Sequence, residues 1–166
     1  MIRAPHDIRK PHGGAHGFTL IELIVVMAVL GILAMATLPL AEISVQRDRE
    51  HELRRAVWEI RDAIDAYKRA VDAGTIAMVS GDSGYPPSLQ ALVSATPNSK
   101  ATGQVQTFIR RIPRDPFSDE VGSAEATWGL RSYGTPAEAP KPGSDVYDIY
   151  SRSNKIGLNG VPLKEW

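Results

Sequence analysis

One carboxylate lies inside an otherwise uncharged, largely apolar run, and its type and position suggest chemistry. Residues 18–41 carry a single charged side chain, Glu22, four positions after Phe18. A charge in the hydrocarbon of a bilayer costs about 2.5–3.5 kcal/mol on insertion scales, so a chain that keeps one there is expected to supply a partner. The partner of Glu22 must be positive.

Gly17, just before the apolar run, is a point where the chain could be cut. A secretory signal peptide has an apolar stretch of about 7–15 residues with the small-residue cleavage site after it. Here the small residue comes first. Cleavage after Gly17 would keep the apolar segment on the mature chain and place an α-amino group on Phe18. That amine supplies a positive partner for Glu22, in the same molecule or in a neighbour.

The run Gly17-Phe18-Thr19-Leu20-Ile21-Glu22, followed by apolar residues, resembles the class III signal of type IV pilin-like proteins, and most of all that of the major pseudopilins of type II secretion. The resemblance implies that a prepilin peptidase cuts after Gly17 and methylates Phe18. It also implies that Glu22 pairs with the N-terminus of a neighbouring subunit during assembly. An ordinary signal anchor with an isolated glutamate is the alternative.

The element that must position Glu22 is a helix over residues 18–41. An α-helix rises about 1.5 Å per residue, so this segment is long enough to cross a bilayer core of about 30 Å. Gly31 and Pro39 are its weak points, because proline removes an amide donor and crowds the carbonyl four residues earlier. The resemblance implies that the helix kinks or melts near Pro39 in the filament; an ordinary membrane-helix proline is the alternative.

The next segment, residues 42–74, predicts an amphipathic continuation of this helix, with Gly74 as its stop. Apolar residues recur at steps of three and four, which gives one core-facing stripe. The stripe consists of Leu53, Val57, Ile60, Ile64, Tyr67 and Val71. The opposite face is typical of a solvated surface and carries Arg54, Arg61, Asp62, Asp65, Lys68 and Asp72.

After the helix, the sequence predicts two further regions. Residues 75–126 connect the helix to the sheet and include a short helix capped by Ser88, and residues 127–166 form a small sheet. Aromatic and β-branched side chains favour strands at 127–133 and 146–151, paired antiparallel across a proline-rich loop, and a third near 161–166. Residues 85–93 and 108–117 extend the resemblance to the pseudopilins. We therefore predict an α+β pilin-like fold: a cleaved leader (1–17), a long helix, membrane-spanning and then amphipathic, and an antiparallel sheet of about three strands.

The resemblance implies a calcium ion in the C-terminal loop, held by acidic side chains, because this hard cation takes oxygen ligands. This chain departs from that pattern, since residues 152–166 have Glu165 as their only acid. The chain also has no cysteine and so no thiolate metal site. We expect no cofactor and no metal. A further hypothesis is that Lys155 or Arg152 replaces the ion by bridging the loop to Asp115, Asp119 or Asp148.

Little in the sequence favours catalysis. His6, His12 and His16 lie in the leader, and His51 stands on a charged helix. Asp115 and Asp119 have no positioned nucleophile beside them, and there is no glycine-rich phosphate loop. Nineteen basic and nineteen acidic residues leave the chain without net charge, and neither end is a nucleic-acid patch.

The sequence therefore predicts a structural subunit and not an enzyme. The resemblance implies a precursor in the bacterial inner membrane, single-pass, with its C-terminal domain in the periplasm, that polymerises into the helical filament of the type II secretion pseudopilus. Its implied partners are copies of itself, minor pseudopilins, the inner-membrane assembly platform, the prepilin peptidase and, before assembly, lipid; nucleic acid is not expected. A minor pilin of a type IV pilus and a membrane-anchored periplasmic enzyme or binding domain are the alternatives.

Overall fold

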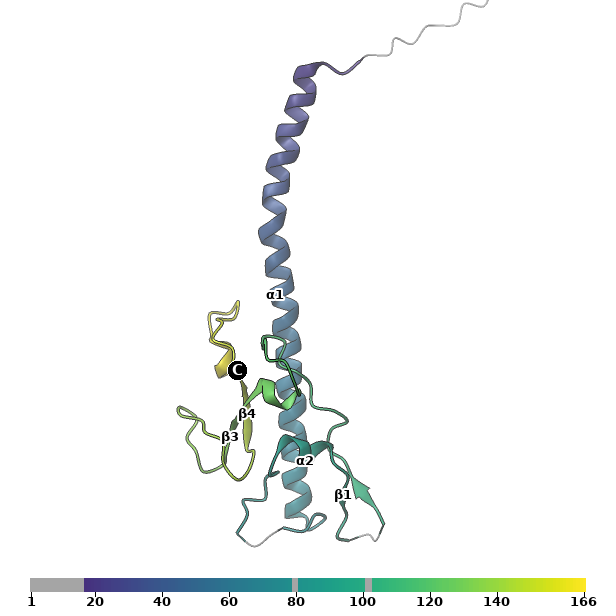
Figure 1. Cartoon of the computed structure of the whole chain (residues 1–166), viewed down its shortest axis with the longest axis vertical. Coiled ribbons are helices and arrows are strands. Elements are labelled where there is room, and N and C mark those ends of the chain that lie inside the picture. The colour runs from purple at the N-terminus through teal and green to yellow at the C-terminus, as the bar shows by residue number, and fades with distance from the viewer. Residues whose placement is uncertain (1–16, 79–80, 101–102) are drawn as a thin grey trace, which may run out of the picture. The chain divides into compact units, whose positions relative to one another are not determined.

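One long helix and two small sheets make up the computed structural model, which describes residues 17–78, 81–100 and 103–166 (Figure 1). The side chains of residues 36–41 and the predicted leader before Gly17 lie outside the described residues. The elements in chain order are α1 (Leu20–Asp72), α2 (Leu89–Val93), β1 (Thr96–Pro97), β2 (Val105–Gln106), the 3₁₀ helix η1 (Glu125–Thr127), β3 (Trp128–Arg131), β4 (Asp148–Ser151) and the 3₁₀ helix η2 (Leu163–Glu165). The α+β class predicted from the sequence is confirmed.

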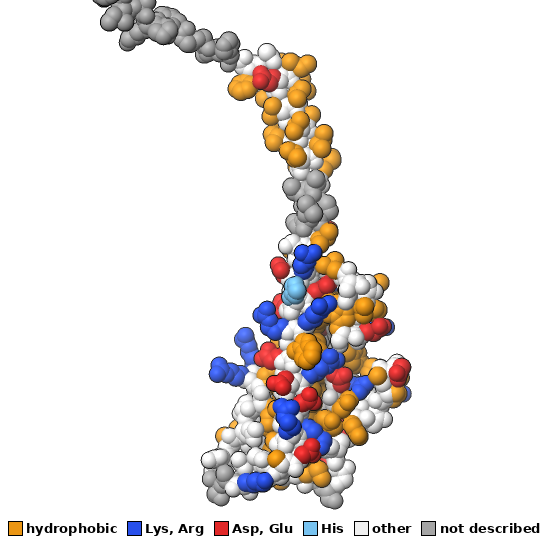
Figure 2. All heavy atoms as spheres, turned by 180° about the vertical axis from the view of Figure 1, so that it is seen from behind, with side chains coloured by type: hydrophobic (Ala, Val, Ile, Leu, Met, Phe, Trp, Pro, Cys, Tyr) orange, Lys and Arg blue, Asp and Glu red, His pale blue; other side chains and the backbone are white. Residues whose placement is uncertain are grey.

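The chain consists of two units, Met1–Glu42 and Ile43–Trp166, each defined by contacts among its own residues. In the first unit, the large hydrophobic side chains described between Phe18 and Met35 are all between 46% and 83% exposed, and Figure 2 shows them covering this part of α1. Within the part of the chain that the structure describes, no helix is both long and apolar enough to cross a membrane. The predicted span, residues 18–41, includes the six positions 36–41 whose side chains are not described.

In the second unit, the predicted stripe of α1 is buried except at Tyr67, which is partly buried. Leu53 and Ile60 are fully buried, Ile64 and Val57 nearly so, and Val71 is 7% exposed, which confirms the helical periodicity. The opposite face is polar, and Figure 2 shows positive and negative side chains intermingled over this unit. The helix ends at Asp72, and Gly74 follows with a φ of 67°, a conformation that glycine adopts without steric cost.

The predicted hairpin is present as β3 and β4, paired antiparallel from Trp128 opposite Ser151 to Arg131 opposite Asp148. The expected third strand near 161–166 is wrong. Gly160 has a φ of 80°, and the backbone turns back so that Ile156 bridges Pro162, after which η2 forms. The sheet therefore has two strands, not about three, and η2 lies against β4.

A second sheet and a short helix lie in the segment that connects α1 to β3. Strands β1 and β2, two residues each, pair antiparallel and were not foreseen. Helix α2 begins as predicted at Ser88, whose hydroxyl accepts a hydrogen bond from the backbone N–H of Ala91 at 3.3 Å. Residues 108–109 then bond back to the carbonyl of Leu92, which fixes the course of the chain after α2.

The core of the second unit forms where the α1 stripe meets the sheet. Trp128 on β3 and Ile149 on β4 are 2% and 1% exposed and cluster with Leu53, Ile60 and Ile64. The indole N–H of Trp128 donates to the carbonyl of Pro113 at 2.9 Å, so the largest buried side chain leaves no polar atom unpaired. This core lies beneath the loops that line the pocket between residues 117–120 and 152–155.

Candidate functional site

The predicted processing point is accessible. Gly17 and Phe18 precede α1 in non-helical backbone, no heavy atom lies within 4 Å of a Cβ built on Gly17, and Phe18 is 83% exposed. A peptidase needs access to the backbone at the bond it cuts. The geometry at this point is compatible with cleavage between the two residues.

Glu22 lies in the first turn of α1 and is exposed in this isolated chain. Its backbone N–H donates to the hydroxyl of Thr19 at 3.2 Å, so Thr19 caps the helix. A carboxylate at this end also interacts favourably with the helix dipole. The Thr-x-x-Glu spacing is a known capping signal that could have revealed this local role from the sequence.

Gly31 and Pro39, the predicted points of kinking or melting, both lie within the helical backbone of α1. Gly31 is exposed and no heavy atom lies within 4 Å of a Cβ built there. The side chain of Pro39 lies outside the described residues. The role predicted for these two positions in a filament remains a prediction.

The residues considered for acid–base chemistry are not brought together. Asp115 is 2% exposed, accepts the Ser151 hydroxyl at 2.5 Å and the backbone N–H of Phe117 at 2.8 Å, and so ties a turn to β4. Asp119 and His51 are exposed on different elements. Among the described residues this arrangement gives Asp115 a structural role.

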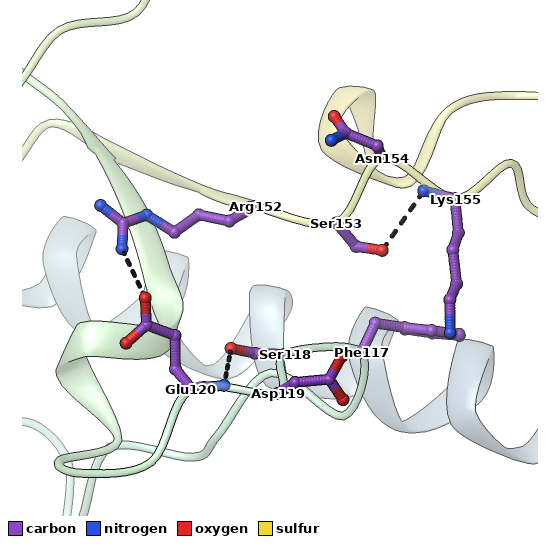
Figure 3. Close-up of a pocket in the computed structure, with 8 residues that line it drawn as sticks. All are labelled: Phe117, Ser118, Asp119, Glu120, Arg152, Ser153, Asn154 and Lys155. Carbon is purple, nitrogen blue, oxygen red and sulfur yellow. Dashed lines mark hydrogen bonds and ion pairs between the residues drawn. The ribbon is translucent and has the colours of Figure 1, made fainter.

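A pocket of about 710 Å³ lies between residues 117–120 and residues 152–155 (Figure 3). Arg152 and Lys155 extend across it from one side, at opposite ends. Arg152 Nη1 lies 3.6 Å from Glu120 Oε1 and donates to the carbonyl of Ala126 at 3.1 Å. The ammonium of Lys155 lies 5.8 Å from the ring centroid of Phe117. The hypothesis that Lys155 or Arg152 bridges the loop to Asp115, Asp119 or Asp148 is therefore wrong, because Arg152 pairs with Glu120 and Lys155 lies over the ring of Phe117.

The residues of this pocket do not fit the calcium ion that the family resemblance implies. The pocket offers two carboxylates, Asp119 and Glu120, and one of them is already paired with Arg152. Calcium takes six to eight oxygen ligands, commonly several of them carboxylates. Within the described residues, no three His, Cys, Asp or Glu side chains are placed to hold a metal ion.

Glu50, on α1, is a residue whose role the sequence did not reveal. It is 7% exposed, and its Oε1 accepts the Leu158 backbone N–H at 2.8 Å and the Gln46 amide at 3.0 Å. Glu50 stands four residues before Arg54, a spacing typical of an ion pair on a helix surface, but Arg54 instead stacks on the Trp166 ring at 4.3 Å. A signal was present: Gln46 and Glu50 continue the apolar stripe to Leu53 at steps of four and three.

A second buried carboxylate, Asp145, joins two loops. It accepts hydrogen bonds from the hydroxyls of Ser83 (2.5 Å) and Ser132 (2.7 Å) and from the backbone N–H of Tyr133 (2.9 Å). Burial by itself would raise the pKa of Asp145, but these three donors hold that pKa below its ordinary value. Beside it, burial and the neighbouring Tyr147 raise the pKa of Tyr85.

Comparison with known proteins finds similarity in the N-terminal segment and over a longer part of the chain. Residues 13–38 match the family model described as the prokaryotic N-terminal methylation motif. A relative named type II secretion system core protein G, from Klebsiella pneumoniae, is 33% identical over 110 residues, which span 63% of this chain and 70% of the relative. No solved structure matches the chain.

Proposed function

The chain belongs to the family of the type II secretion system core protein G, the major pseudopilins, and on that premise we propose that it is cut after Gly17, methylated at Phe18 and polymerised. It is a structural subunit of the type II secretion pseudopilus. The observation that carries this proposal is the combination of the methylation motif at residues 13–38 with similarity that covers 63% of the chain. At the level of the family, the comparison supports a structural role over a catalytic one.

The exposed residues at the predicted cleavage point support the processing step. Gly17 and Phe18 stand clear of other atoms, and α1 begins only at Leu20. Cleavage between them frees the amine of Phe18 one residue before the helix cap at Thr19. The mature chain then begins with a charged group at the entrance of the apolar segment.

Glu22 selects the register in which a subunit is added. Its charge is costly in an apolar environment, and docking beside the N-terminal amine of an earlier subunit relieves that cost. A one-turn slip of the incoming helix would leave both charges without partners. We therefore propose that Glu22 determines where the incoming subunit stops, while the apolar side chains around it supply most of the contact area.

The exposed apolar surface of the first unit supports storage in the bacterial inner membrane, with the second unit in the periplasm. Large contiguous apolar surfaces mark membrane or protein interaction sites, and side chains from Phe18 to Met35 form such a surface. In this proposal lipid covers it before assembly and neighbouring subunits cover it afterwards. Minor pseudopilins, the inner-membrane assembly platform and the prepilin peptidase complete the set of partners.

The experiment that tests this function is mass spectrometry of the intact full-length chain, produced with and without a prepilin peptidase. The expected product with the peptidase is a chain that starts at N-methylated Phe18, and without it an uncut chain. Gly17→Val should block cleavage, whereas Gly14→Val in the same leader should not. A chain that stays uncut with the peptidase, or is cut beyond Ala41, would contradict the proposal.

A further inference from the structure

We infer that the C-terminal loop of this chain, residues 152–162, is held in place by Glu50 of α1 and by the loop's own cations, so that it needs no divalent cation. The inference concerns the stability of the second unit and does not depend on how the chain is processed or assembled. It rests on contacts at three places: the buried carboxylate of Glu50, the pocket between residues 117–120 and 152–155, and the turn within the loop.

The first contact attaches the loop to the helix. Glu50 Oε1 accepts the N–H of Leu158 at 2.8 Å, and the Gln46 amide reaches the Ile156 carbonyl at 3.4 Å. Burying a carboxylate is costly unless it accepts hydrogen bonds, so the donors of Leu158 and Gln46 are what allow Glu50 to stay inside. Because the loop's backbone supplies one of these donors, the buried carboxylate holds the loop against α1.

The second contact places positive charge where a bound cation would provide it. Arg152 lies against Glu120 and Lys155 lies over Phe117, so two cations already occupy the two ends of the pocket. A divalent ion would have to displace Arg152 to gain the Glu120 carboxylate. The other polar side chains that line the pocket are Ser118, Asp119, Ser153 and Asn154, which carry one negative charge between them.

The third contact closes the loop on itself. The N–H of Gly157 donates to the Val161 carbonyl at 2.9 Å, and the N–H of Leu163 donates to the Lys155 carbonyl at 3.0 Å. A Cβ at Gly157 would stand 2.5 Å from the Trp166 ring, so the loop packs on that indole with no room for a side chain. The backbone turn is therefore satisfied without an ion at its centre.

The direct test is thermal unfolding of the full-length chain in detergent, followed by the fluorescence of its tryptophans, in EGTA, in calcium and in magnesium. Trp128 is 2% exposed and reports on the core. The expected result is one midpoint under all three conditions. A midpoint that rises and saturates with either ion would overturn the inference, because ligands that bind the folded state raise its stability.

A second test removes the attachment to α1. Glu50→Leu loses both acceptor oxygens, whereas Glu50→Gln keeps one, so the first variant should release the loop and the second largely retain it. The readout is hydrogen–deuterium exchange of amides 156–161, with amides 148–151 of β4 as the reference. Faster exchange in the loop alone is expected for Glu50→Leu. Unchanged exchange in the loop of Glu50→Leu would overturn the role of Glu50. If Glu50→Leu does not fold, the comparison of EGTA, calcium and magnesium and the loop exchange of Glu50→Gln still test the inference.

A third test reverses the ion pair at the pocket. Arg152→Glu should lower the midpoint at low ionic strength by about 1–4 °C, since half-exposed pairs contribute little. Adding Glu120→Arg should restore it. If the midpoint of the double variant is no higher than that of Arg152→Glu alone, the pairing of Arg152 with Glu120 does not hold the loop. None of these results bears on cleavage at Gly17, so failure here leaves the proposed function intact.

Discussion

The guanidinium of Arg61 and the carboxylate of Asp148 lie 2.7 Å apart, joining the C-terminal part of α1 to the first residue of β4. Arg61 also donates to the carbonyl of Ile149 at 3.4 Å and to the oxygen of Trp166 at 3.1 Å. One side chain on the helix thus contacts the strand and the end of the chain. The sequence had placed Arg61 on a solvated face, and its exposed fraction of 37% shows that it stands at the edge of that face.

Arg61→Ala is expected to destabilise the second unit by about 1 kcal/mol, because it removes charge-assisted hydrogen bonds that solvent partly screens. Arg61→Lys should recover part of this loss, since lysine keeps the charge but not the planar fork. Thermal unfolding of the full-length chain measures both. Arg69→Ala is the matched control on α1, because Arg69 is 67% exposed and lies 3.8 Å from its partner Asp62. Equal effects at Arg61 and Arg69 would contradict this role.

Gly129→Ala is expected to cost about 1–3 kcal/mol through overpacking. Gly129 pairs with Tyr150 across the β3–β4 sheet, and a Cβ at that position would stand 2.3 Å from the Tyr150 ring. The ring would have to leave its place against the strand. Gly134→Ala is the control, because no heavy atom lies within 4 Å of its Cβ position. Denaturant unfolding of both variants is the measurement, and a stable Gly129→Ala would show that the ring moves freely.

Local rules explain what could be predicted from the sequence. The stripe from Leu53 to Val71 is buried because helical periodicity puts those side chains on one face, and Ser88 caps α2 because its hydroxyl reaches the N–H of Ala91. The pairing of β3 with β4 followed from composition and the proline-rich loop between them. Each of these features depends on residues close together in the chain or on a simple repeat.

The features that could not be predicted depend on residues that are far apart in the sequence. Glu50 and Leu158 are 108 positions apart, and no sequence rule pairs them. The last residues, 161–166, have the composition of a strand, but the turn at Gly160 and the hydrogen bonds of η2 compete successfully with strand pairing. Strands of two residues, as in β1 and β2, give too short a pattern to recognise. The mixed charges of α1 similarly concealed which ones contact the sheet.

The buried Asp145 makes acid stability a testable property. Because its folded-state pKa lies below the ordinary value, its hydrogen bonds stabilise the fold fully above the unfolded-state pKa, and this contribution is lost as pH falls through the folded-state value. We expect the wild type to lose stability below about pH 4. Asp145→Asn should be less stable at pH 7 and should lose less on acidification. Asp119→Asn, an exposed acid, is the control; parallel pH curves for wild type and Asp145→Asn would contradict the prediction.

Glu22 offers the sharpest test of assembly, because its side chain and its backbone have separable roles. The N–H of Glu22 bonds to the Thr19 hydroxyl whatever side chain stands at position 22, so Glu22→Gln should preserve the start of α1. Thr19→Ala removes that cap and keeps the carboxylate. A loss of assembly specific to Glu22→Gln would therefore reflect the charge and not the helix.

We expect Glu22→Gln to be cut and methylated like the wild type but to reduce filament yield by at least about tenfold, since an amine docked in an apolar interface would lose its ionic partner. Thr19→Ala should reduce the yield less. Processing is followed by mass spectrometry and filament yield by sedimentation of material sheared from cells that overproduce the chain. Glu42→Gln, which alters an exposed acid at the end of the first unit, should assemble normally. Because the amine exists only after cleavage, Gly17→Val should give few filaments whether or not Glu22 is present, and normal yield from Glu22→Gln would exclude the charge pair as the basis of register.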